Sequence, residues 1–132
     1  MDYIKDSLNC DASYLKSKDI MEWQVKDTLT GELLLKQIAY GGSANVAEYL
    51  AVIDTMILQE EQGSNFPIYT DSKIAMIWLK KEYCGTWQDL PQKTQDLVDE
   101  YTEILKDIGY NYEVLKWHTW KWGEIPSDFG RK

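Results

Sequence analysis

The sequence predicts an α/β protein with one mixed five-stranded sheet, in which three antiparallel strands precede parallel ones and helices pack on both faces. Two observations predict it. The first 40 residues hold three segments with strand-like patterns, and the remainder runs helix, strand, two helices and a last strand. No repeat, low-complexity tract or linker divides the 132 residues, so we expect a single domain over residues 1–132.

The three opening strands are predicted at residues 7–14, 21–26 and 32–40. In the first, even positions are apolar and odd positions, including Asp11, are polar, as in a half-buried strand. The second and third are joined by a polar stretch that ends in Gly31, which suits a tight hairpin.

Five further elements are predicted from helical spacing, apolar runs and turn residues. They are a helix from Asn45 to the residue before Gly63, a strand at 66–70, helices beginning at Ser72 and Pro91, and a strand at 113–119. The remaining tail is expected to be a loop with at most one helical turn, from Pro126 onward.

The composition excludes several classes of protein. With 44% apolar and 13% aromatic residues the chain is too rich in packing material to be disordered. No apolar stretch approaches the length of a membrane span and no signal peptide is evident, so we expect a cytoplasmic protein with no membrane partner. Cys10 and Cys84 lack the spacing of a zinc site, and we expect both to be reduced.

The formal net charge of −8 is unfavourable for nucleic-acid binding, because affinity for phosphates normally comes from Lys and Arg. The objection weakens if several carboxylates converge on divalent cations, which cancel charge where a nucleic acid docks.

Four acids lie in or beside the predicted elements: Asp11, Glu48, Asp71 and Asp128. Two have ordinary structural explanations, since Glu48 fits a capping box with Asn45, and Asp71 can cap the helix that follows it. The combination of the four acids favours a functional site over separate structural roles, because strand ends and the helix starts beside them share one rim of an α/β sheet. Clustered carboxylates repel one another unless a proton or cation intervenes, and their hard oxygens suit Mg²⁺ or Mn²⁺.

Three local sequences resemble type 1 ribonuclease H, especially its bacterial branch. They are an Asn-x-x-Glu helix start at residues 45–52, a strand–Asp–Ser junction at 67–75, and the tail at 116–132, which contains Trp-Gly-Glu-Ile-Pro-Ser-Asp-Phe-Gly-Arg-Lys. The resemblance covers almost the whole chain. It is weakest in the N-terminal third, where residues 9–13 are the one local anchor.

The resemblance implies a ribonuclease H-like fold and an endonuclease that hydrolyses the RNA strand of RNA–DNA hybrids with two Mg²⁺ or Mn²⁺ ions, leaving 5′-phosphomonoesters. Asp11 would bridge the two ions, with Glu48 and Asp71 on the leaving-group side and Asp128 at the ion that activates water. Glu124 would lie near that ion and assist turnover or product release.

The resemblance also implies contacts with the hybrid from Asn45, Ser72, Lys73, Trp78 and Thr119. Helical spacing fits Trp78 equally well to the core. The family branch needs no histidine at the position of His118, the one histidine in the chain.

One departure from the family concerns residues 12–18, which lack the Gly-rich loop that follows the first catalytic Asp. Because Gly permits close backbone approach and the 2′-hydroxyl distinguishes RNA from DNA, discrimination between the two stays open. We expect a monomer. Two alternatives remain: a nuclease of the same fold acting on DNA, and a non-catalytic nucleic-acid-binding module, which would be free to lose the acids that are present here.

Overall fold

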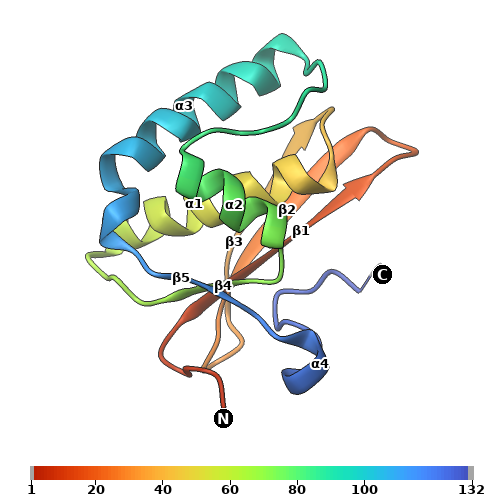
Figure 1. Cartoon of the computed structure of the whole chain (residues 1–132). Helices are drawn as coiled ribbons and strands as arrows, with labels where there is room; N and C mark the ends of the chain where they lie inside the picture. Colours follow the sequence, from red (N-terminus) through yellow and green to blue (C-terminus); the bar gives the residue numbers. More distant parts are fainter. Residues whose placement is uncertain (1, 131–132) are drawn as a thin grey trace.

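The computed structural model describes residues 2–130, and their centre is a mixed five-stranded sheet in the order β3-β2-β1-β4-β5 (Figure 1). The strands are β1 (Leu8–Leu15), β2 (Ile20–Asp27), β3 (Leu33–Tyr40), β4 (Ile68–Thr70) and β5 (Val114–Lys116). The first three are antiparallel, β4 is parallel to β1, and β5 is parallel to β4. The sheet predicted from the sequence is confirmed.

Three helices cover one face of the sheet, and the C-terminal segment covers part of the other (Figure 1). The helices are α1 (Ala44–Gln62), α2 (Lys73–Lys81) and α3 (Gln92–Ile108), followed by the 3₁₀ turn η1 (Gly109–Asn111) and the short α4 (Thr119–Trp122). The main core lies between the sheet and α1–α3. A smaller core of Tyr69, Trp117 and Ile125 lies on the opposite face, because alternate residues of β4 and β5 point to opposite sides.

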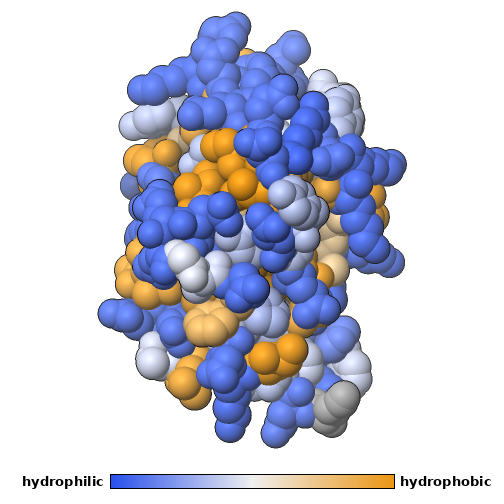
Figure 2. All heavy atoms as spheres, turned by 90° about the vertical axis from the view of Figure 1, so that its left-hand side faces the viewer, coloured by the Kyte–Doolittle hydropathy of each residue, from blue (hydrophilic) through white to orange (hydrophobic). Residues whose placement is uncertain are grey.

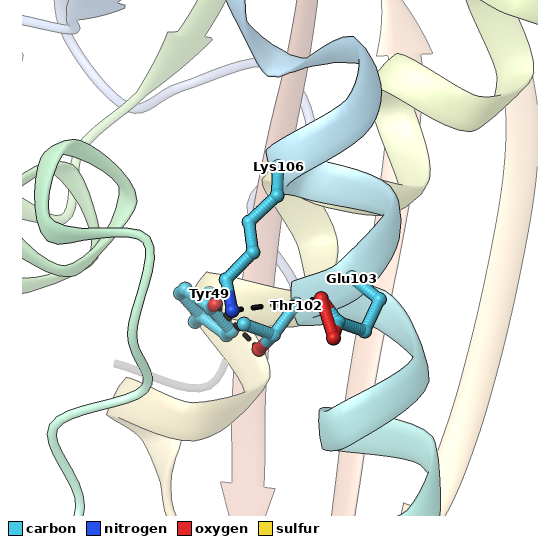
Figure 3. Close-up of polar contacts among 4 residues, drawn as sticks. All are labelled: Tyr49, Thr102, Glu103 and Lys106. Carbon is cyan, nitrogen blue, oxygen red and sulfur yellow. Dashed lines mark hydrogen bonds and ion pairs between the residues drawn. The ribbon is translucent and has the colours of Figure 1, made fainter.

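Helix α1 is the central element of the helical layer, and it is buried along most of its length. Its Tyr49 hydroxyl hydrogen-bonds to Thr102 Oγ1 of α3 at 2.7 Å, so a polar contact ties the two helices together above the apolar core (Figure 3). Nearby, Lys106 and Glu103 form an exposed ion pair at 3.5 Å within α3, and an exposed pair of this kind adds little stability.

Two serines cap the helices that begin beside the predicted acids. Ser43 Oγ accepts a hydrogen bond from the Val46 amide at the start of α1, and Ser72 Oγ accepts one from Ala75 at the start of α2. The predicted caps at Asn45 and Asp71 are therefore wrong. The two serines are the capping residues of these helices, and the Glu48 carboxylate accepts the Ala12 amide of β1.

The last strand is shorter than predicted, since β5 ends at Lys116 and Thr119 begins α4. The predicted loop between Thr119 and Trp122 is also wrong, because those residues form one helical turn. The turn is fixed by the indole N–H of Trp117, which donates to the Gly123 carbonyl at 2.8 Å. Of the tail motif, Arg131 and Lys132 lie outside the described residues.

The segment that lacks glycine after Asp11 forms part of a regular hairpin. Strand β1 continues to Leu15 and stays in register with β2 up to the pair Leu15–Ile20. Asp19 takes a left-handed conformation at the turn, with φ of 52°. Residues 12–15 are therefore strand, and an ordinary strand needs no glycine.

Figure 2 shows one face of the molecule, on which several separate hydrophobic areas lie among hydrophilic side chains. A cavity of about 390 Å³ lies between the helices and β5, lined by apolar side chains that include Met56, Met76, Leu79, Leu105 and Val114. None of the four predicted metal-binding acids lines it. Within residues 2–130, no helix has both the length and the apolar character needed to cross a bilayer.

Candidate metal centre

Three of the predicted acids meet at one place. Asp11, Glu48 and Asp71 each offer a carboxylate oxygen, and these oxygens lie within 4.8 Å of one another. Asp11 comes from β1, Glu48 from α1, and Asp71 from the junction between β4 and the cap of α2. Acids 23 or more residues apart in the sequence are thus brought together at one rim of the sheet.

The divergence of β1 and β4 explains how α1 reaches this rim. The two strands pair at Leu8–Ile68 and Asn9–Tyr69, and β4 ends one residue later. Beyond that point β1 is no longer paired with β4. There the Ala12 amide donates to Glu48 Oε1 at 2.9 Å and not to a neighbouring strand. The end of β4 therefore opens the gap in which the three carboxylates meet.

Burial and mutual repulsion dominate the electrostatics of the site. Asp11 is fully buried and Glu48 is 7% exposed. Burial raises the pKa of the Glu48 carboxyl well above its usual range, and the charges of Asp11 and Asp71 raise it further. The same causes act on the neighbouring thiol, because burial and then the charge of Glu48 raise the pKa of Cys10. This site holds a proton more tightly than an exposed carboxylate would.

These residues fit a hard divalent cation. Glu48 Oε1 accepts the Ala12 amide, whereas the buried Oε2 has no hydrogen-bond partner among the described residues. A buried oxygen without a donor costs free energy, and a cation held by three carboxylates would remove that cost together with the repulsion. Oxygen-only ligands favour Mg²⁺, Mn²⁺ or Ca²⁺ over zinc.

The fourth acid, Asp128, lies on a segment held against the same strands but is not a member of the set within 4.8 Å. The amide of its neighbour Ser127 donates to Asn9 Oδ1 at 2.8 Å, and Gln24 Nε2 donates to the Ser127 carbonyl. Asn9 is two residues before Asp11, and Gln24 is the cross-strand partner of Asp11. The segment that holds the half-buried Asp128 therefore lies against β1 and β2, at the residue two before Asp11 and at the residue opposite it.

The other predicted site residues are more dispersed. Asn45, Lys73, Thr119 and Glu124 are exposed, and Ser72 is half-buried at the cap of α2. Trp78 is half-buried and packs on the main core, with its ring 6.1 Å from that of Tyr49. The structure therefore assigns Trp78 a packing role, which was one of its two predicted interpretations.

Two residues that position the site were missed from the sequence: Asn9 and Gln24. Asn9 Nδ2 also donates to the Lys26 carbonyl and to Thr28 Oγ1, so its amide joins β1, β2 and the C-terminal segment. The one available signal was strand parity, which places Asn9 on the same side of β1 as Asp11. Nothing in the sequence indicates that Ser127 lies over it.

Several solved structures similar to this chain are ribonuclease H proteins or domains. The N-terminal RNase H domain of a Mycobacterium tuberculosis protein has 14% identity and a TM-score of 0.55, with 85% of this chain and 78% of that chain covered. RNase H1 from Halobacterium salinarum has 12% identity and a TM-score of 0.53, with 87% and 86% covered.

A third similar structure is the protease–reverse transcriptase of prototype foamy virus, with 16% identity and a TM-score of 0.57. It covers 95% of this chain and 18% of that chain. No model of a known protein family matches the sequence. The similarity therefore shows that the fold is ribonuclease H-like, and it shows the fold alone.

Proposed function

We propose that this chain is a metal-dependent endonuclease that hydrolyses the RNA strand of RNA–DNA hybrids. The supporting observation is the group of Asp11, Glu48 and Asp71 at the rim of a ribonuclease H-like sheet, of which the first two are buried and the third is half-buried. Carboxylates gathered in this way raise one another's cost of ionisation, and a group of this kind is explained if it binds cations. The proposed cofactor is Mg²⁺ or Mn²⁺, with two ions in each site.

Each acid has a role under this proposal. As the family resemblance implies, Asp11 would contact both ions, and Glu48 and Asp71 would hold the ion on the leaving-group side. Asp128 would hold the other ion, since its segment is fixed to Asn9 and Gln24 around Asp11. When bound, such ions lower the pKa of a water molecule and stabilise the charge that develops on the phosphate.

The residues of the chain supply position and exclude bulk water. The Ala12 amide fixes the orientation of Glu48, and burial of Asp11 keeps water away from the carboxylates. Glu124, exposed four residues before Asp128, is proposed to assist turnover or product release. Asn45, Ser72, Lys73 and Thr119 are proposed to contact the hybrid, with a smaller part for the half-buried Trp78.

The proposed binding partner is the substrate itself, an RNA–DNA hybrid duplex, rather than another protein. The hairpin after Asp11 affects how well the chain would discriminate RNA from DNA. Residues 12–15 are strand and offer no Gly-rich loop to the 2′-hydroxyls. A DNA nuclease of the same fold is the second candidate for this reason.

Cleavage of end-labelled duplexes tests the proposal. Hybrid, double-stranded RNA and double-stranded DNA of one sequence are compared with Mg²⁺, with Mn²⁺ and with a chelator, using wild type, Asp71→Asn and the exposed control Asp107→Asn. The expected result is metal-dependent cleavage of the RNA strand by wild type and the control, and loss of at least a hundredfold in Asp71→Asn. The proposal fails if all three proteins cleave equally or none cleaves any duplex.

A further inference from the structure

Trp120 is a large apolar side chain at the surface, at the end of a chain of tilted and edge-on ring contacts. It is 83% exposed, although burial of a tryptophan is strongly favourable. Its ring centroid lies 6.0 Å from that of His118, which lies 5.1 Å from Trp122. Trp122 in turn lies 5.1 Å from Trp117, which is almost fully buried. This chain of ring contacts links the smaller core to the exposed indole.

The segment that contains Trp120 begins and ends beside the candidate metal centre. At its start, the Trp117 amide donates to the carbonyl of Thr70, the residue before Asp71, at 2.8 Å. At its end, Ser127 is bonded to Asn9 on β1. Residues 118–126, which include α4, therefore form an excursion with both ends at the carboxylate rim (Figure 1).

The local charge of this excursion differs from that of the chain. The whole protein has 22 acids and 14 Lys and Arg residues, whereas residues 118–126 hold one lysine, Lys121, and one acid, Glu124, so the excursion carries no net charge. Lys121 is exposed, and its Nζ lies 5.9 Å from the centre of the Trp122 ring. Lys121 directly follows Trp120 in the sequence, and an exposed indole next to a lysine in the chain matches a nucleotide, which offers a flat base and a phosphate.

We propose that Trp120 is a stacking platform for an unpaired base next to the duplex, with Lys121 near the phosphate of that nucleotide; this inference rests on the proposed function. Bases inside a duplex are covered on both faces by their neighbours. The face of an indole is thus available only to a base in a single-stranded extension or at a frayed end. The preferred substrate would then be a hybrid that continues into single strand.

Tyr110 provides a matched control. It is also 83% exposed, but it lies in η1, which precedes β5, whereas α4 follows β5. The two aromatic side chains therefore lie toward opposite ends of that strand. A general effect of removing an exposed ring would appear in both variants, and an effect on a bound base would appear only at Trp120.

The test measures KM and kcat for three hybrids: blunt, extended by a single-stranded DNA segment, and extended by an abasic segment of equal length. The abasic extension keeps the phosphates and removes the bases. Wild type, Trp120→Ala, Trp120→Phe and Tyr110→Ala are compared, and melting curves check that each folds. Binding of the same labelled single strand, with and without bases, is followed by fluorescence anisotropy.

The expected result is a KM about tenfold higher for Trp120→Ala on the base-containing extension, with kcat, the blunt hybrid and the abasic hybrid nearly unchanged. Trp120→Phe should restore most of the affinity, and Tyr110→Ala should match wild type. Equal losses on all three hybrids, or no loss on any, would overturn the inference while cleavage itself still supports the proposed function. If wild type neither binds nor cleaves any hybrid, both proposals are wrong.

Discussion

The backbone N–H of Ala12 and the Oε1 atom of Glu48 are 2.9 Å apart, in a hydrogen bond that spans 36 residues of the sequence. The bond uses one oxygen of a buried carboxylate and leaves the other directed at the acid group without a donor. Glu48 therefore has two separable properties, a structural acceptor and a charge, and substitution can remove one without the other.

Glu48→Gln should separate these two properties from Glu48→Ala. Glutamine keeps an acceptor for Ala12 and removes the charge, so the protein without metal should melt no lower than wild type and have no nuclease activity. Alanine leaves the buried amide unpaired, which should lower the free energy of unfolding by about 1–3 kcal/mol. Melting curves and cleavage assays on both variants measure this. Equal melting temperatures for the two would mean that the Ala12 contact has no structural value.

Asp11→Asn should stabilise the protein when metal is absent. It removes one fully buried charge from the group at nearly constant volume, and relief of repulsion should raise the free energy of unfolding by about 1 kcal/mol. Millimolar Mg²⁺ or Mn²⁺ should stabilise wild type clearly more than the variant. Four melting curves, each protein with and without metal, are sufficient. If wild type melts higher without metal and both respond alike to it, the acids do not act as one cation site.

Gln24→Ala should reduce activity by releasing the segment that holds Asp128. Loss of the bond to the Ser127 carbonyl should cost about 1 kcal/mol of stability, and a displaced Asp128 should lower kcat roughly tenfold or more. Thr94→Val is the control, because it removes a side-chain hydrogen bond to the Tyr40 carbonyl away from the acids. A similar fall in kcat for both variants would show that activity follows stability rather than the position of Asp128.

Glu124→Gln should slow turnover less than Asp128→Asn. Glu124 is exposed on the excursion, whereas Asp128 is half-buried on the segment fixed to β1 and β2. The proposed roles make Asp128 a direct metal ligand and Glu124 an assistant to product release. Single-turnover and steady-state rates in Mg²⁺ distinguish the two steps, and equal losses in both would contradict this ranking.

Asp54→Asn should raise stability at neutral pH and leave it nearly unchanged in acid. Burial raises the pKa of Asp54, although the hydrogen bond from Trp23 Nε1 at 2.8 Å lowers it in part. The folded protein therefore binds this proton more tightly than the unfolded chain does. Its contribution to stability is present below the unfolded-state pKa of about 4 and is lost as pH rises through the folded-state pKa.

Asparagine imitates the protonated form, so the gain over wild type should grow as pH rises above about 4 and level off once the folded-state pKa of Asp54 is passed. Melting temperatures over that range measure it. A difference between the proteins that does not change with pH would exclude Asp54 as the titrating group.

Local sequence patterns were sufficient to predict the strands of the sheet and to place Asp11, Glu48 and Asp71 on the elements that hold them. Alternation fixed which side of β1 holds Asp11, and the change from strand to helix at Asp71 was correctly located. The cap of α1 was misassigned because Ser43 and Asn45 are both good capping residues, and propensity does not choose between them. The choice depends on the turn after Gly42, where the chain enters the helix.

The C-terminal segment could not be predicted, because its structure depends on contacts distant in sequence. Thr119 was assigned to a strand from its neighbours, yet the strand ends where its partner β4 ends, at Thr70. The bond between Asn9 and Ser127 spans 118 residues, and the local hydrophobic periodicity of a sequence does not predict contacts over such a separation. The roles of Asp128 and Glu124 were expected from the resemblance alone.

The same bond between Asn9 and Ser127 has a consequence for how the protein matures during translation. Strands β1–β3 and α1 can pair as soon as they leave the ribosome, since their contacts are local. The return of the chain to β1 must wait until residue 127 has been made. A nascent chain that has not yet reached residue 127 would thus present Asp11, Glu48 and Asp71 without Asp128, and the proposed four-acid centre would be assembled only after that residue has been made.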